Sequence, residues 1–156
     1  MDTKRNSLDT GLLILRVVLG IVMVAHGSQK LFTFGYPGVV GAMTQMGLPL
    51  PQVSAALIIA AEFGGGLLLI GGLLTRFAAA SVAFGMAVAA IQVHLPNGFF
   101  APNGYEYTLM LAGAGLALVL TGAGRFSLDA LIAGRRRTPA LDAYETAAPG
   151  TTRRVA

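Results

Sequence analysis

The chain has 156 residues, of which 54% are hydrophobic and only 12% are charged, about half the charge of a typical soluble domain. This composition excludes an ordinary water-exposed surface and favours a lipid environment. The net charge of +4 could indicate nucleic acid, but most basic residues border apolar runs, so membrane topology explains them better. Because cysteine is absent, disulfides, thiol relays and cysteine-ligated clusters within this chain are excluded.

Four apolar runs predict four membrane-spanning helices. In chain order they cover residues 10–33, 53–74, 77–94 and 106–122. The last two are near the lower limit of about 17 residues that cross a bilayer. The predicted fold is therefore an all-α, integral membrane four-helix bundle over residues 1–134, followed by a basic, disordered cytoplasmic tail over residues 135–156.

A cleaved signal peptide is the alternative for the first run, because Lys4 and Arg5 give it a basic start. Arg16 interrupts its apolar region, however, and the polar stretch after Ala25 is typical of the end of a membrane helix. A retained first span is therefore the favoured interpretation.

The basic residues lie on one side of the four predicted spans, with Lys30 as the exception on the other side. The residues on the first side are Lys4, Arg5, Arg76, Arg125, Arg135, Arg136, Arg137, Arg153 and Arg154. The positive-inside rule then predicts that the N- and C-termini are both cytoplasmic.

The connections are predicted from their turn-forming residues. The two outer connections, residues 35–52 and 94–106, are rich in glycine, proline and aromatic residues and should form a lid. After Arg125, Ser127 and Asp129 are candidate capping residues of a short interfacial helix.

One face of the first span combines charged and small residues. Arg16, Gly20, Met23, Gly27 and Lys30 recur at intervals of three and four, so they share a helix face and allow another helix to approach closely. The faces predicted to meet it are Ala55, Glu62, Gly65 and Gly66; Ser81, Gly85, Ala89 and Gln92; and Glu106, Met110, Gly113 and Ala117.

Glu62 and Arg16 are ionisable residues inside predicted spans, where a charge is costly and normally has a partner or a function. Antiparallel packing of the first two spans would place them at similar depth. Two interpretations stay open: a structural ion pair between them, or a carboxylate at position 62 that carries a proton or binds a ligand.

A second polar group is predicted near the outer surface. It comprises His26, Gln29, Lys30, Gln92, His94, Tyr105 and Glu106. The predicted proton-transfer residues are His26, His94 and Glu106, because imidazole and carboxylate groups exchange protons with substrates. The predicted substrate-binding residues are Arg16, Lys30, Glu62, Gln92 and Tyr105. A simple Lys30–Glu106 salt bridge at the interface is the alternative, and two histidines without a set spacing identify no metal site.

Several short motifs occur in a characteristic order over residues 10–132. They are RVVLG (16–20), HGSQKL (26–31), GLP (47–49), EFGGG (62–66), TR (75–76), His94, NGF (97–99), YEY (105–107) and GAGRFSLD (122–129). This series resembles the DoxX family of small bacterial membrane proteins. The resemblance implies a multi-pass, four-helix protein of the bacterial cytoplasmic (inner) membrane that is linked to redox chemistry. Such relatives include the DoxD-type subunit of thiosulfate:quinone oxidoreductase, and others are implicated in complexes with superoxide dismutase and a sulfurtransferase.

The leading functional hypothesis is a membrane subunit that binds a quinone or similar small molecule and supports an oxidoreductase partner in oxidative-stress or sulfur metabolism. The sequence has no flavin, haem or iron–sulfur signature, so electrons would come from that partner or from a diffusible substrate. The alternatives are a non-enzymatic scaffold that recruits proteins, or a small transporter, which with four helices would need to form a homo-oligomer. Nucleic acid is not an expected partner.

Overall fold

A computed structural model describes residues 2–134, and this part of the chain contains helices and turns but no β-strand. The elements, in which η1 to η3 are π-helical and η4 is a 3-10 helix, are α1 (Asp2–Ser28), η1 (Gln29–Phe34), α2 (Gly35–Gln45), α3 (Pro51–Ile59), η2 (Ala60–Gly64), α4 (Gly65–Gly71), α5 (Thr75–Ala89), η3 (Ala90–His94), η4 (Leu95–Asn97) and α6 (Glu106–Thr121). The predicted tail, residues 135–156, lies outside the described residues.

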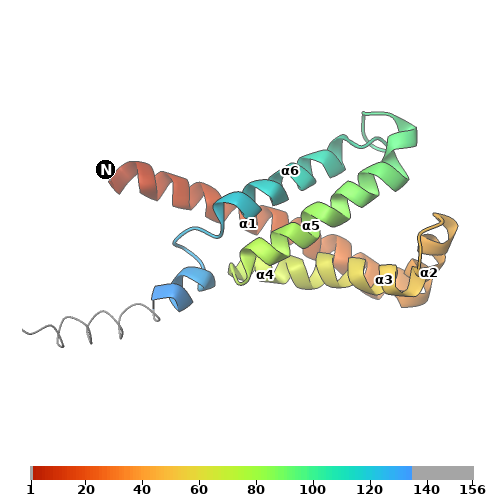
Figure 1. The fold of residues 1–156 in the computed structure, drawn as a ribbon, viewed down its shortest axis with the longest axis horizontal. Helices are drawn as coiled ribbons and strands as arrows, with labels where there is room; N and C mark the ends of the chain where they lie inside the picture. The colour runs from red at the N-terminus through yellow and green to blue at the C-terminus, as the bar shows by residue number, and fades with distance from the viewer. Residues whose placement is uncertain (1, 135–156) are drawn as a thin grey trace, which may run out of the picture.

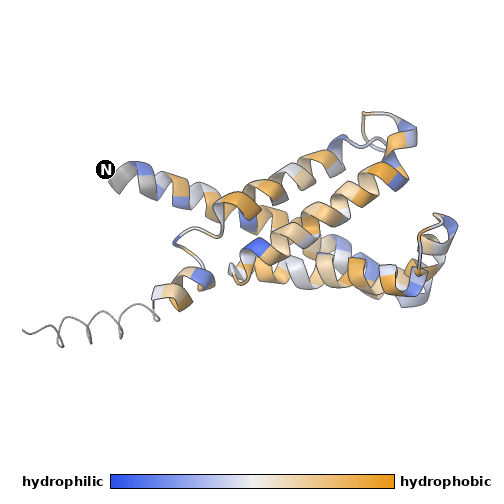
Figure 2. Cartoon of the chain, viewed as in Figure 1, coloured by the Kyte–Doolittle hydropathy of each residue, from blue (hydrophilic) through white to orange (hydrophobic). Residues whose placement is uncertain are grey.

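Three helical stretches are long and apolar enough to cross a bilayer: Asn6–Gln45, Pro51–Gly71 and Thr75–Asn97. Figure 2 shows that apolar residues dominate these helices and that hydrophilic residues gather mostly near their ends. α6 is also apolar, but its 16 residues extend only about 24 Å, less than the ~30 Å of hydrocarbon. The all-α membrane fold is confirmed, and the fourth span stays a prediction.

The connection between the first two spans differs from the predicted lid of turns. Most of it forms the helix α2, which folds back against α3 (Figure 1). The chain can reverse at Gly35 because its φ of +68° lies in the left-handed region that glycine tolerates. Val39 and Met43, four residues apart on one face of α2, are buried against Ala55 of α3, and this burial stabilises the helix.

The main core joins α1, α4, α5 and α6. Its buried residues are Leu19, Met23, Leu69, Ala78, Ala79, Val82, Met86 and Leu118. α1 and α4 meet backbone to backbone, since a Cβ atom added to Gly20 would lie 2.7 Å from the carbonyl oxygen of Gly66. The predicted close-packing glycine face of the first span is therefore confirmed, and so is its partner face, because Ala55, Glu62 and Gly66 are all buried.

The predicted inner faces of the last two helices are wrong. α5 instead buries Thr75, Ala78, Ala79, Val82, Ala83 and Met86, and α6 buries Thr108, Gly115 and Leu118. Helices that are apolar on every side carry no amphipathic signal for the buried face. The faces that α5 and α6 bury are fixed instead by the close contact between the two helices. A Cβ atom added to Gly115 of α6 would lie 3.0 Å from the carbonyl oxygen of Ala79 of α5.

The bundle has two ends that differ in structure. Named after the predicted topology, the outer end carries α2 and the 98–105 loop, and the inner end carries the α4–α5 turn and the segment 122–134. Figure 1 shows the α5–α6 hairpin diverging from α2 and α3 toward the outer end. Side chains on these two parts of the outer end are therefore held apart.

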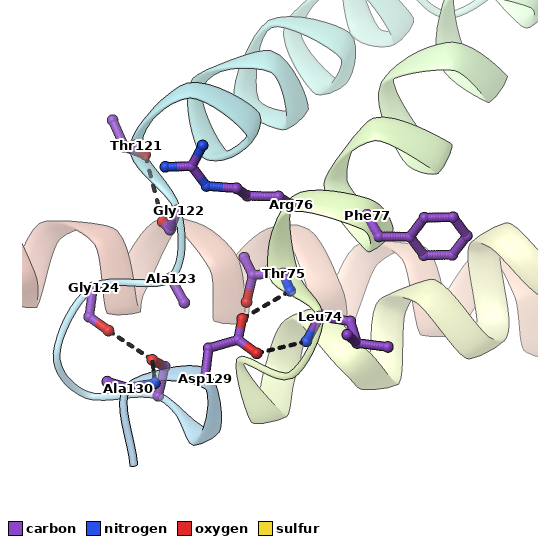
Figure 3. Close-up of a pocket in the computed structure, with 11 residues that line it drawn as sticks. Leu74, Thr75, Arg76, Phe77, Thr121, Gly122, Ala123, Gly124, Asp129 and Ala130 are labelled. Carbon is purple, nitrogen blue, oxygen red and sulfur yellow. Dashed lines mark hydrogen bonds between the residues drawn. The ribbon is translucent and has the colours of Figure 1, made fainter. Parts of the chain in front are cut away.

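Segment 122–134 returns from α6 to the α4–α5 turn and ends in the predicted short helix, which covers residues 128–134. Ser127 caps it, since its Oγ accepts a hydrogen bond from the backbone N–H of Ala130 at 3.1 Å. Asp129 has a different role from the one predicted. Its carboxylate accepts the backbone N–H groups of Leu74 and Thr75 at 2.8 and 2.9 Å, and it thereby caps α5 (Figure 3).

Candidate site at the Lys30–Glu62 ion pair

Lys30 and Glu62 form an ion pair between the first two spans. The Nζ atom of Lys30 donates to Oε2 of Glu62 at 2.6 Å, and their side chains are 23% and 5% exposed. The predicted Arg16–Glu62 pair is therefore wrong, and so is the alternative pairing of Lys30 with Glu106. Glu62 pairs with Lys30 because the lysine lies beside it, at the start of η1, which directly follows α1.

The close approach of the two spans makes this pair possible. One turn before Lys30, Gly27 packs against the backbone of Phe63, where an added Cβ atom would lie 2.4 Å from the Phe63 nitrogen. Because no side chain separates the helices at Gly27, the lysine stem can cover the short distance to Glu62. The glycine and the ion pair thus belong to one helix–helix contact.

Four predicted site residues lie within π-helical segments: Lys30 in η1, Glu62 in η2, and both Gln92 and His94 in η3. A π-helical turn is rare, often occurs at functional sites and interrupts the regular α-helical hydrogen bonding. It also shifts the direction of the side chains that follow. This irregular backbone is a second reason to treat the Lys30–Glu62 region as a functional site.

An apolar hollow of about 430 Å³ opens beside the ion pair. It is lined by Lys30, Phe34, Gly38, Val39, Ala42, Met43 and Met46. The lysine is the only charged side chain among these residues, so the hollow suits a mainly apolar ligand that also offers a hydrogen-bond acceptor. The lining residues of α2 were not predicted, although the spacing of Val39, Met43 and Met46 indicates a helix face.

The remaining predicted outer residues form a separate group around the 98–105 loop. Nδ1 of His94 lies 2.8 Å from the carbonyl oxygen of Asn103, and Oε1 of Glu106 accepts the backbone N–H of Ala101 at 2.8 Å. Tyr105 packs against the ring of Phe99. These contacts close the loop, and the role of His94 and Glu106 in proton transfer stays a prediction.

His26 and Gln92 are not drawn into the ion-pair site either. His26 is half-buried and its ring lies 6.2 Å from that of Tyr107, so it connects α1 with α6. Gln92 is exposed on η3. The structure therefore divides the single predicted outer cluster into the Lys30–Glu62 pair, the His26–Tyr107 contact and the loop group.

Arg16 is buried at 2% exposure and binds backbone oxygens. Its guanidinium donates to the carbonyl groups of Leu69 at 2.9 Å and Ile70 at 2.6 Å, and also to that of Phe126. It therefore satisfies the C-terminal carbonyls of α4 and fastens segment 122–134 to α1. Asp9 also attaches segment 122–134 to α1, because its carboxylate accepts a hydrogen bond from the backbone N–H of Arg125 at 3.0 Å.

Within residues 2–134, no group of three or more histidine, cysteine, aspartate and glutamate side chains could hold a metal ion.

Comparison with known proteins decides the family. The DoxX family model matches residues 11–95, which include both members of the ion pair. The chain belongs to the DoxX family. As expected of a DoxX protein with several apolar helices, it is a multi-pass protein of the bacterial inner membrane.

Curated relatives match this DoxX protein over most of its length. The putative oxidoreductase CatD of Bacillus subtilis is 34% identical over 127 residues, which cover 81% of this chain and 90% of CatD. The inner membrane protein YqjF of Escherichia coli is 34% identical over 126 residues, covering 80% of this chain and 93% of YqjF. No solved structure matches the chain.

Proposed function

We propose that this DoxX protein is a redox-associated membrane subunit that binds a quinone or a similar small molecule beside the Lys30–Glu62 pair and supports an oxidoreductase partner. The observation that carries the proposal is the part-buried ion pair that opens onto an apolar hollow. The name of the relative CatD, a putative oxidoreductase, supports the redox association.

The chemistry of the hollow fits a lipophilic carbonyl compound. Phe34, Met43 and Met46 offer an apolar and polarizable surface to a ring. The partly exposed ammonium of Lys30 can donate to a carbonyl oxygen of that ring, while Glu62 holds the ammonium in place. A ligand of this kind would enter from the bilayer, and its electrons would come from the partner protein.

The proposed topology has four spans and cytoplasmic termini, with α6 as the fourth span. Arg76 and Arg125 are supporting observations, because both lie at the inner end. Reporter fusions after Arg76 should read cytoplasmic and fusions near Gly38 and Asn103 external; an external reading after Arg76 would contradict this arrangement.

The functional proposal is tested on full-length protein purified in mild detergent. We expect quinone to be extracted from the preparation, and we expect a short-chain quinone added to protein stripped of it to bind saturably. Lys30→Met removes the donor and should weaken binding about tenfold or more, since a charge-assisted hydrogen bond is lost. Ala42→Phe, which fills the hollow, should weaken it without altering the ion pair.

The matched control is Ala80→Phe, which adds the same ring to an exposed alanine of α5 and should leave binding unchanged. If Lys30→Met and Ala42→Phe both bind quinone as the unaltered protein does, the hollow is not the site. If no quinone is retained or bound while a second protein co-purifies, the chain acts as a scaffold.

A further inference from the structure

The inner end of the bundle carries a second hollow, between the α4–α5 turn and segment 122–134 (Figure 3). Its volume is about 510 Å³, and Leu74, Arg76 and Phe77 line it on one side, with Gly122, Asp129 and Ala130 on the other. It lies at the opposite end of the molecule from the Lys30–Glu62 pair, so the proposed quinone site does not account for it.

Arg76 supplies an unpaired positive charge to this hollow. Arg16 and Arg125 both donate hydrogen bonds, whereas Arg76 has no hydrogen bond or ion pair within residues 2–134. Figure 3 shows its guanidinium extended toward Gly122. A Cβ atom at position 122 would lie 3.4 Å from Nε of Arg76, so the glycine leaves the guanidinium uncovered on that side.

The carboxylate of Asp129 also lines the hollow, but both of its oxygens are already engaged. Both of its oxygens accept backbone N–H groups at the start of α5, where the helix dipole favours a negative charge. Arg16 attracts it as well. Of the two charged side chains that line the hollow, Arg76 is therefore the one without a hydrogen-bond partner within residues 2–134.

The surroundings of Arg76 suit an amphiphile better than a free anion. Leu74 and Phe77, which line the hollow, are 58% and 69% exposed. Phe126 and Leu128, which are neighbours of lining residues in the sequence, are exposed as well. Arg76 is the second residue of the Thr75–Asn97 stretch, so it lies at the boundary of the hydrocarbon, at the depth of the lipid phosphates. We infer that this hollow binds the phosphate headgroup of an anionic phospholipid through Arg76, with the acyl chains against the exposed apolar side chains.

Native mass spectrometry of the full-length protein tests this inference. Phosphatidylglycerol should bind in preference to phosphatidylcholine, and Arg76→Gln should weaken that binding by about fivefold, because one arginine–headgroup attraction is lost. Ala130→Leu fills the hollow while Arg76 keeps its charge, and it should also weaken binding. This second variant keeps the test valid if Arg76→Gln is poorly folded.

The matched control is Lys4→Gln, which removes the same charge at an exposed position outside the hollow and should leave lipid binding unchanged. Equal losses in Lys4→Gln and Arg76→Gln, or no loss in Ala130→Leu, would overturn the site. Complete displacement of the lipid by millimolar inorganic phosphate would show an anion site without lipid preference, and it would also overturn the inference.

Discussion

Glu62 is the most buried acidic residue among those whose burial is described, at 3% exposure for the whole residue, and Lys30 is its ion-pair partner. A carboxylate removed from water loses several kcal/mol of hydration, which a well-placed partner can offset. Lys30 is better placed than Arg16 because its stem runs alongside Glu62 while the ammonium still reaches the hollow. The pair can therefore be stable and still present a donor to a ligand.

A double-mutant cycle measures this dependence. Lys30→Met should lower the free energy of unfolding by about 3 kcal/mol, because Glu62 is left buried without a partner. Glu62→Gln should cost less, since Lys30 is partly exposed and can turn toward water. Combining the two should recover part of the loss, as measured by unfolding in mixed detergent micelles.

The control for this cycle is the pair Arg16→Gln and Glu62→Gln, whose effects should add, because Arg16 binds carbonyl groups and not Glu62. A coupling energy below about 0.5 kcal/mol between Lys30 and Glu62 would contradict the account.

The sequence predicted that Arg16, Lys30 and Glu62 are among the site residues, but the pairings it predicted, Arg16 with Glu62 or Lys30 with Glu106, were wrong. The free-energy cost of burying a charged side chain can be inferred from the residue type and its position in a span. The partners of Arg16 are backbone carbonyls at the end of α4 and in segment 122–134. Backbone groups carry no sequence signal, so this arrangement could not be predicted from the residues alone.

At the scale of the helices, Gly27 controls the contact of α1 with η2. Gly27→Ala should destabilise the protein by about 1–3 kcal/mol, because the added methyl group would overlap the backbone of Phe63, which cannot move aside as a side chain can. Gly113→Ala is the control, since an added Cβ atom there meets nothing within 4 Å. Melting in detergent compares them, and an equally stable Gly27→Ala protein would contradict the close contact.

The helices differ in how well their buried faces could be predicted. α1 and the second span mark their inner faces with glycine and charged residues, and those faces were predicted correctly. α5 and α6 consist almost entirely of apolar and small residues, so their faces depend on how Gly115 fits against Ala79. The helix α2 was missed because its glycines and Pro37 favour turns, although Val39 and Met43 gain burial against α3.

At the scale of the whole molecule, the divergence of the α5–α6 hairpin decides which predicted residues meet (Figure 1). His94 and Glu106 lie at the same end of the bundle as Lys30, as predicted, but they close the 98–105 loop. Depth along a span can be estimated by counting residues, whereas lateral separation depends on crossing angles that follow from packing. The sequence could therefore predict that the site residues lie at a similar depth in the bundle, but not which of them contact one another.

The central claim is that a quinone binds in the hollow beside Lys30 and Glu62, and photoaffinity labelling in membranes tests it most directly. A quinone carrying a photoreactive group should label the segment that lines the hollow, residues 30–46, and excess unlabelled quinone should suppress the labelling. Ala42→Phe should abolish this labelling, and Ala80→Phe should not. Labelling that is confined to the 98–105 loop, or that unlabelled quinone does not suppress, would contradict the claim.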